Sequence, residues 1–189
     1  MAASSPTSAN ALRYRATSVW PWVRWLLGTI KILESPEWVE FAGADWAKTI
    51  MDVEVTDRRF SKQGRGIGRW ILHHQGRRLS VYLKRHYRLS WWRGLLAWLW
   101  PWRDWSPGLQ EARRLLWAQR QGLPVPRVLA AGEEVQPGGR LTSFLAVEEL
   151  ADMVPLHEAL PQAAQRLPGL AFRGWKRGLA AEIARLTRF

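Results

Sequence analysis

The chain has 189 residues, of which 47% are apolar and 14 are tryptophan, so it can bury one substantial core and is expected to fold. The lack of cysteine excludes disulfides, thiolate metal sites and cysteine nucleophiles and favours a cytoplasmic location, and four scattered histidines argue against a zinc site. The formal net charge of +12 indicates an anionic partner: nucleic acid, a nucleotide phosphate or an acidic membrane surface.

Residues 1–47 are expected to form a Trp-rich, partly disordered N-terminal extension. The first ten residues are small and polar, which is typical of a frayed tail. The following run from Ser18 to Leu33 is apolar but is interrupted by Pro21, Gly28 and two basic residues. It is too short and too charged to span a membrane, which takes ~20 apolar residues, and it has no signal-peptide cleavage pattern. We therefore expect a packing or interfacial segment.

Residues 48–150 begin with three expected strands. The first, Met51 to Phe60, places Val53 and Val55 on one face between charged neighbours. The second, Arg69 to His74, follows a loop whose glycines allow the backbone to approach another group closely. These glycines are Gly64, Gly66 and Gly68. The third strand is LSVYLKRH, whose period-two pattern places Leu79, Val81 and Leu83 on the core face and Ser80, Tyr82 and Lys84 on the other.

A helix is expected from Pro107 to Gly122, after an aromatic stretch. Ser106 can cap it, proline suits its first turn, and glycine can end it. Its apolar face carries Leu109, Ala112 and Leu116, and Glu111 is its only carboxylate. Two strands follow, in LPVPRVLAAGEE and LTSFLAVEEL, which completes a predicted α+β lobe of five antiparallel strands and one helix. Residues 151–189 are expected to be the first helices of a truncated second lobe, because the pattern becomes helical from Pro155 and ends without a cap.

The order of these parts is that of a protein-kinase-like N-terminal lobe. In such a lobe, glycines let backbone N–H groups cover phosphates, a lysine supplies positive charge to them, and a helix glutamate orients the lysine. The candidates for these nucleotide-binding roles are Gly64, Gly66, Gly68, Lys84 and Glu111. Backbone groups near Glu149 and Leu150, in the acidic hinge, would meet the edge of the adenine base.

Three segments resemble the lipopolysaccharide core heptose and Kdo kinase family: VYLKRHYRLSWWRGLL, SPGLQEARRLLWAQRQGLPVPRVLAAGE and FLAVEELADMVPLHEAL. The resemblance covers about residues 55–189. It implies a protein-kinase-like fold and ATP- and Mg²⁺-dependent phosphorylation of a sugar, heptose or Kdo, on a lipid-linked glycan. It also implies a location at the cytoplasmic face of the inner membrane, with nucleotide and lipopolysaccharide as partners.

Two departures from this family bear on activity. Tyr82 stands where protein kinases usually carry a small alanine, so its ring would either stack on the base or block it. The family's catalytic Asp and its metal-binding Asn and Asp should follow the last helix, but Asn10 is the only asparagine and Asp152 the only aspartate after Glu111. We assign no catalytic or metal-binding residue and expect no useful phosphoryl transfer by this chain alone.

Each of these interpretations has a plainer alternative. The glycine loop could be a flexible hairpin connection, and Lys84 and Glu111 could be two solvated charges. A salt bridge between these two side chains would favour nucleotide binding, whereas side chains pointing apart into water would oppose it. A kinase-like relic or pseudokinase could also bind nucleotide, lipid or a partner without catalysis, through the exposed face where a second lobe would pack. The exposed apolar face of the terminal helix favours this alternative.

Six tryptophans and two arginines lie in the 15 residues from Trp91 to Trp105. A small lobe cannot bury so many rings in one connection, and tryptophan prefers the membrane–water interface. We expect a peripheral contact with an anionic membrane here, with core packing as the alternative. The expected contact residues are Trp91, Trp92, Trp98, Trp100 and Trp102, assisted by Trp20, Trp22 and Trp25. Nucleic acid is the least favoured partner, because no RNA-binding signature is present and the tryptophans cluster with leucines.

Overall fold

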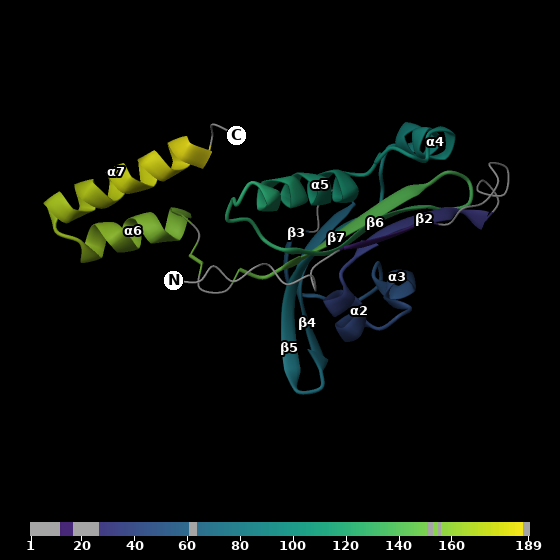
Figure 1. Ribbon diagram of the computed structural model, residues 1–189, viewed down its shortest axis with the longest axis horizontal. Helices are drawn as coiled ribbons and strands as arrows, with labels where there is room; N and C mark the ends of the chain where they lie inside the picture. The colour runs from purple at the N-terminus through teal and green to yellow at the C-terminus, as the bar shows by residue number, and fades with distance from the viewer. Residues whose placement is uncertain (1–11, 17–26, 61–63, 151–152, 155, 187–189) are drawn as a thin grey trace. The chain divides into compact units, whose positions relative to one another are not determined.

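The computed structural model describes residues 12–16, 27–60, 64–150, 153–154 and 156–186, in two compact units, Met1–Glu149 and Leu150–Phe189. In the first unit the strands form one antiparallel sheet in the order β1-β2-β6-β7-β5-β4-β3 (Figure 1). The predicted α+β class is confirmed. The expected count of five strands is wrong, because the described residues contain seven.

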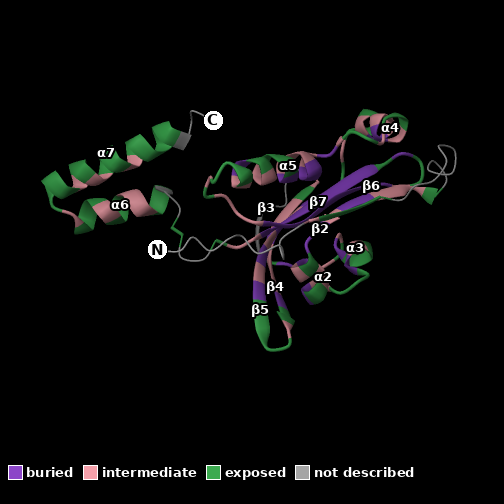
Figure 2. Ribbon diagram, viewed as in Figure 1, coloured by how far each residue is buried: buried purple, intermediate pink, exposed green. Residues whose placement is uncertain are grey.

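The bounds of these elements follow the chain. The strands are β1 Arg13–Ala16, β2 Thr29–Glu34, β3 Thr56–Phe60, β4 Arg65–His74, β5 Arg77–His86, β6 Val128–Val135 and β7 Leu141–Glu148. The helices of this unit are α2 Pro36–Ala42, α3 Trp46–Thr49, α4 Trp91–Leu99 and α5 Pro107–Arg120. Strands β6 and β7 are buried along almost their whole length (Figure 2).

Two of the strands come from the region that the sequence suggested was a separate extension. Strand β2 pairs with β6, and β1 pairs with β2 at the edge of the sheet. Within β2, Ile32 is buried in the core, and Lys31 is buried beside Glu133 on the opposite face. Residues 29–49 therefore belong to the same compact unit as the sheet, and no boundary falls at residue 47. The sequence did not predict β2 because its residues continue the apolar run that ends at Leu33.

Helices cover both faces of the sheet. Helices α2 and α3 pack on one face through Trp38, Trp46 and neighbouring apolar residues, with the two indole rings edge to face at 5.5 Å. Helix α5 packs on the other face, where Leu109 and Ala112 meet apolar residues of β6 and β7. The predicted core face of β5 is confirmed, because Leu79, Val81 and Leu83 are all buried.

The first predicted strand begins later than expected, at Thr56. The buried guanidinium of Arg85 donates hydrogen bonds to the carbonyl oxygens of Met51 and Val53, at 3.0 and 2.7 Å. These carbonyls are held by a side chain from β5 instead of by a neighbouring strand. The expectation of a strand over residues 51–55 is therefore wrong.

The predicted helix after the aromatic stretch is confirmed as α5. The Ser106 side chain accepts a hydrogen bond from the Leu109 N–H at 3.4 Å, and proline occupies the first turn. This cap fixes where the helix starts, and so sets which residues face the sheet.

The second unit contains α6 Leu156–Arg166 and α7 Gly169–Leu186, which confirms the helical pattern expected in this region. Phe172 and Trp175 stack at 6.0 Å on α7. Leu160 of α6 and Leu179, Ala180 and Ile183 of α7 line an open apolar groove between the two helices.

Candidate functional site

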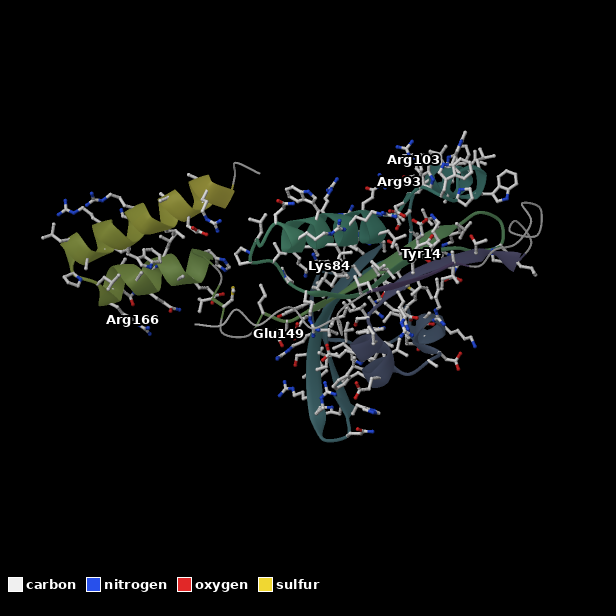
Figure 3. The ribbon with its side chains drawn as sticks, in the orientation of Figure 1. Tyr14, Lys84, Arg93, Arg103, Glu149 and Arg166 are labelled. Atoms are coloured by element: carbon white, nitrogen blue, oxygen red, sulfur yellow. The ribbon has the colours of Figure 1, made fainter. Side chains whose placement is uncertain are left out.

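The centre of the candidate site is an ion pair between strand β5 and helix α5. The alternation of β5 turns Lys84 to the face that α5 covers, and α5 presents Glu111 toward it. Lys84 Nζ lies 2.5 Å from Glu111 Oε1, and the two side chains are 32% and 39% exposed. Figure 3 shows Lys84 between α5 and the sheet. The two groups are thus paired, and the alternative of separate solvated charges does not hold.

Further basic groups act on His86, which lies two residues after Lys84 on β5. Arg65 of β4 pairs with His86 of β5 in the sheet register, and the His86 ring lies 3.3 Å from the Ser143 hydroxyl. Burial and the charge of Arg65 hold the pKa of His86 below its usual value; Lys84 and Arg93 act in the same direction, and Glu111 acts against them. Three cations and one carboxylate therefore act on this histidine. Such a surplus of positive charge favours an anionic ligand.

The three glycines do not form the expected loop. Gly64 lies in a turn with φ of +73°, but Gly66 and Gly68 lie inside β4. A Cβ on Gly68 would come within 2.2 Å of Val55 Cγ2, and one on Gly66 within 3.2 Å of the Tyr87 ring. Close packing therefore accounts for both strand glycines, and residues 61–63 lie outside the described part of the chain.

In the acidic hinge, both the backbone N–H and the carboxylate of Glu149 already have partners within the first unit. Its N–H donates to the Ser80 carbonyl at 2.9 Å, and its carboxylate accepts from Arg69 at 2.6 Å. The Glu149 N–H is therefore committed within the sheet, so it cannot also meet a base in this conformation. Leu150 is the first residue of the second unit.

The ring of Tyr82 packs against the apolar cluster between α5 and the sheet. It is half-buried and shares the sheet face of Lys84. The packing holds this ring beside the lysine, where a base bound to this face would have to accommodate it.

The tryptophans of the aromatic stretch divide into exposed and packed rings. Trp91 and Trp102 are 76% and 71% exposed, and Trp92 and Trp100 are 44% and 42% exposed. Trp98 is half-buried on the same helix. The assisting Trp20, Trp22 and Trp25 lie outside the described residues. Four of the five expected contact residues are thus accessible.

A hollow of about 470 Å³ lies along α5, lined on one side by residues of β1 and β2. Its walls are leucines, with polar groups from Tyr14, Asp104, Arg113 and Arg120. No sequence motif indicates it, because it is assembled from the N-terminal strands and a helix about a hundred residues later.

Among the described residues, no three histidine or acidic side chains are grouped so that they could hold a metal ion. Glu111, the carboxylate beside Lys84, is already paired, so these residues do not fit a Mg²⁺ site.

None of the helices in the described part of the chain is both long and apolar enough to cross a bilayer.

Comparison with known protein families, curated proteins and solved structures gives no match for this chain.

Proposed function

We propose that the first unit is the nucleotide-binding N-terminal lobe of a kinase-like protein related to the lipopolysaccharide core heptose and Kdo kinases. The observation that carries this proposal is the 2.5 Å pair between Lys84 and Glu111, presented by a strand and a helix in the order such lobes use. The proposed substrate class is a phosphorylatable sugar of a lipid-linked glycan at the cytoplasmic face of the inner membrane.

The chain's own residues have simple roles in this proposal. Phosphate oxygens accept from Lys84 Nζ, while Glu111 holds the ammonium in place and limits its rotation. Arg65 and Arg93 add positive charge near the same end of β5. ATP would supply the phosphoryl group, and a charge-assisted hydrogen bond to an ionised phosphate is the strongest kind of contact available here.

The proposal for this chain extends to binding and not to transfer. Asn10 is its only asparagine, and Asp152 is its only aspartate beyond Glu111, so the family's catalytic base and metal ligands have no counterparts in residues 1–189. A second candidate function, a non-catalytic kinase-like module, is favoured by the same observation and by the engaged N–H of Glu149. The first candidate requires nucleotide to bind near Lys84, whereas the non-catalytic module could bind nucleotide, lipid or a partner.

The test is a calorimetric titration of the purified chain with ATP, comparing wild type with Lys84→Met. Losing one charge-assisted contact of about 1.5–3 kcal/mol should weaken binding by roughly 10- to 150-fold. Lys48→Met is the matched control, because Lys48 also forms a lysine–carboxylate pair but lies in α3, on the opposite face. Equal affinities for the wild type and Lys84→Met, or no binding by the wild type, would contradict the proposal.

A further inference from the structure

Helix α4 packs against one end of the sheet through its small residues. Gly94 and Ala97 are buried, and a Cβ on Gly94 would lie 1.7 Å from the carbonyl oxygen of Gly139, in the turn between β6 and β7. The helix backbone therefore rests directly on that turn. Because small residues make this contact, the large residues of α4 lie on the other sides of the helix.

The outward side of α4 and the segment after it carry large apolar side chains that are exposed to solvent. These side chains are more than two-fifths exposed: Trp91, Trp92, Leu99, Trp100 and Trp102. We call these five residues the tryptophan surface. Isolated exposed apolar residues are common, but five of them within twelve consecutive positions of the chain indicate an interaction site.

The charges beside the tryptophan surface are positive. The guanidinium of Arg93 lies 5.2 Å from the centre of the Trp92 ring, and that of Arg103 lies 5.5 Å from the Trp105 ring (Figure 3). Helix α4 contains no acidic residue, and the nearest one in sequence, Asp104, is paired with Arg113. A partner for this surface must therefore accept indole rings and positive charge together.

We infer that the tryptophan surface docks on the interfacial region of an anionic lipid bilayer. Indole rings concentrate at the headgroup level of a membrane, and arginines beside them gain from anionic headgroups. A nine-residue helix lying on the surface can bury its apolar side without crossing the bilayer. A second copy of the chain fits less well, because two such surfaces would bring like charges together.

This inference does not require nucleotide binding, but it places the two sites at one end of the sheet. Gly139, on which α4 rests, lies two residues before the first residue of β7, and Ser143 near the start of β7 pairs with His86 at the end of β5. Lys84 lies two residues before His86. A chain docked through α4 therefore holds this end of β5 near the headgroups, where a lipid-linked acceptor would be found.

The experiment is co-sedimentation with vesicles of phosphatidylethanolamine and phosphatidylglycerol at low salt. The wild type and a Trp91→Ser/Trp102→Ser variant are compared, since these two rings are the most exposed and their loss should leave the fold intact. We expect the variant to bind at least roughly tenfold more weakly, because vesicle affinity scales with buried apolar area. Trp117→Ser is the matched control, since Trp117 is 45% exposed but lies on α5.

Two further measurements distinguish the possible partners. Vesicles of phosphatidylcholine alone should bind the wild type less, and Arg103→Gln should reduce binding to the anionic vesicles while circular dichroism remains unchanged. The inference is overturned if the wild type does not sediment with anionic vesicles, or if the Trp91/Trp102 variant and the Trp117 variant bind equally. Self-association of the wild type that the double variant abolishes, without vesicle binding, would assign the surface to a second copy instead.

Discussion

Replacing Glu133 with glutamine should destabilise the first unit more than most single substitutions. Glu133 is 1% exposed, and its carboxylate lies 2.5 Å from Lys31 Nζ. Its other oxygen accepts from the backbone N–H groups of Trp105 and Ser106, at 3.2 and 3.0 Å. One carboxylate thus ties β2 and β6 to the start of α5, the helix that carries Glu111.

The size of the effect follows from burial. Removing one partner of a buried ion pair leaves the other charge uncompensated and costs about 3–5 kcal/mol. Glutamine keeps the shape and one accepting oxygen, so we take the lower limit, about 3 kcal/mol, which for a chain of this length lowers Tm by about 6–12 °C. Lys31 is 8% exposed, so water cannot readily replace the lost charge.

The assay is urea unfolding followed by far-ultraviolet circular dichroism, with Glu54→Gln as the control because Glu54 is exposed. The control should change the free energy of unfolding by less than about 0.5 kcal/mol. A loss below about 1 kcal/mol for Glu133→Gln, with an unchanged denaturant slope, would refute the reasoning that this carboxylate is a buried partner of Lys31.

Other substitutions test the packing and the titration of the site. Gly68→Ala should lower the free energy of unfolding of the first unit by about 1–3 kcal/mol, because the added Cβ would lie 2.2 Å from Val55 Cγ2. Gly174→Ala in α7 is the control, because its Cβ would meet open space and should not destabilise the second unit. Equal effects of the two substitutions in thermal unfolding would contradict the close approach of Gly68 to Val55. The pKa of His86 is lowered in the folded state, so the unfolded chain binds more protons and stability should fall as the pH drops below the usual histidine pKa of 6.5. His86→Gln should make that fall smaller in urea unfolding at about pH 7.5 and pH 5.5, and an identical pH dependence in wild type and variant would count against the burial of this ring.

The elements that the sequence predicts well are those whose signals are local. The alternation of β5 fixes the faces of Leu83 and Lys84, and the Ser106–Pro107 start fixes α5, so the approach of Glu111 to Lys84 could be anticipated. The exposed rings of the aromatic stretch follow from the number of tryptophans, which exceeds what one small core can bury.

The parts that could not be predicted depend on contacts between distant residues. Lys31 meets Glu133 across 102 positions, and without that contact β2 looks like the end of an apolar extension. Arg85 donates hydrogen bonds to the carbonyl oxygens of Val53 and Met51, which lie 32 and 34 residues earlier in the chain. These carbonyls are thus bound by a side chain, and residues 51–53 do not pair in the sheet. A glycine gives no sign of whether a phosphate or a neighbouring side chain, here Val55 against Gly68, occupies the space beside it.

The central claim is that Glu111 acts on a bound phosphate through Lys84. The most direct test is a double-mutant cycle of ATP affinity, measured by calorimetry for wild type, Lys84→Met, Glu111→Gln and the double variant. If the pair works as one unit, each single variant should bind more weakly and Glu111→Gln should add little once Lys84 is gone, giving a coupling of about 1 kcal/mol or more. Additive effects, or affinities unchanged in all four proteins, would contradict the account and leave the pair a structural contact between β5 and α5.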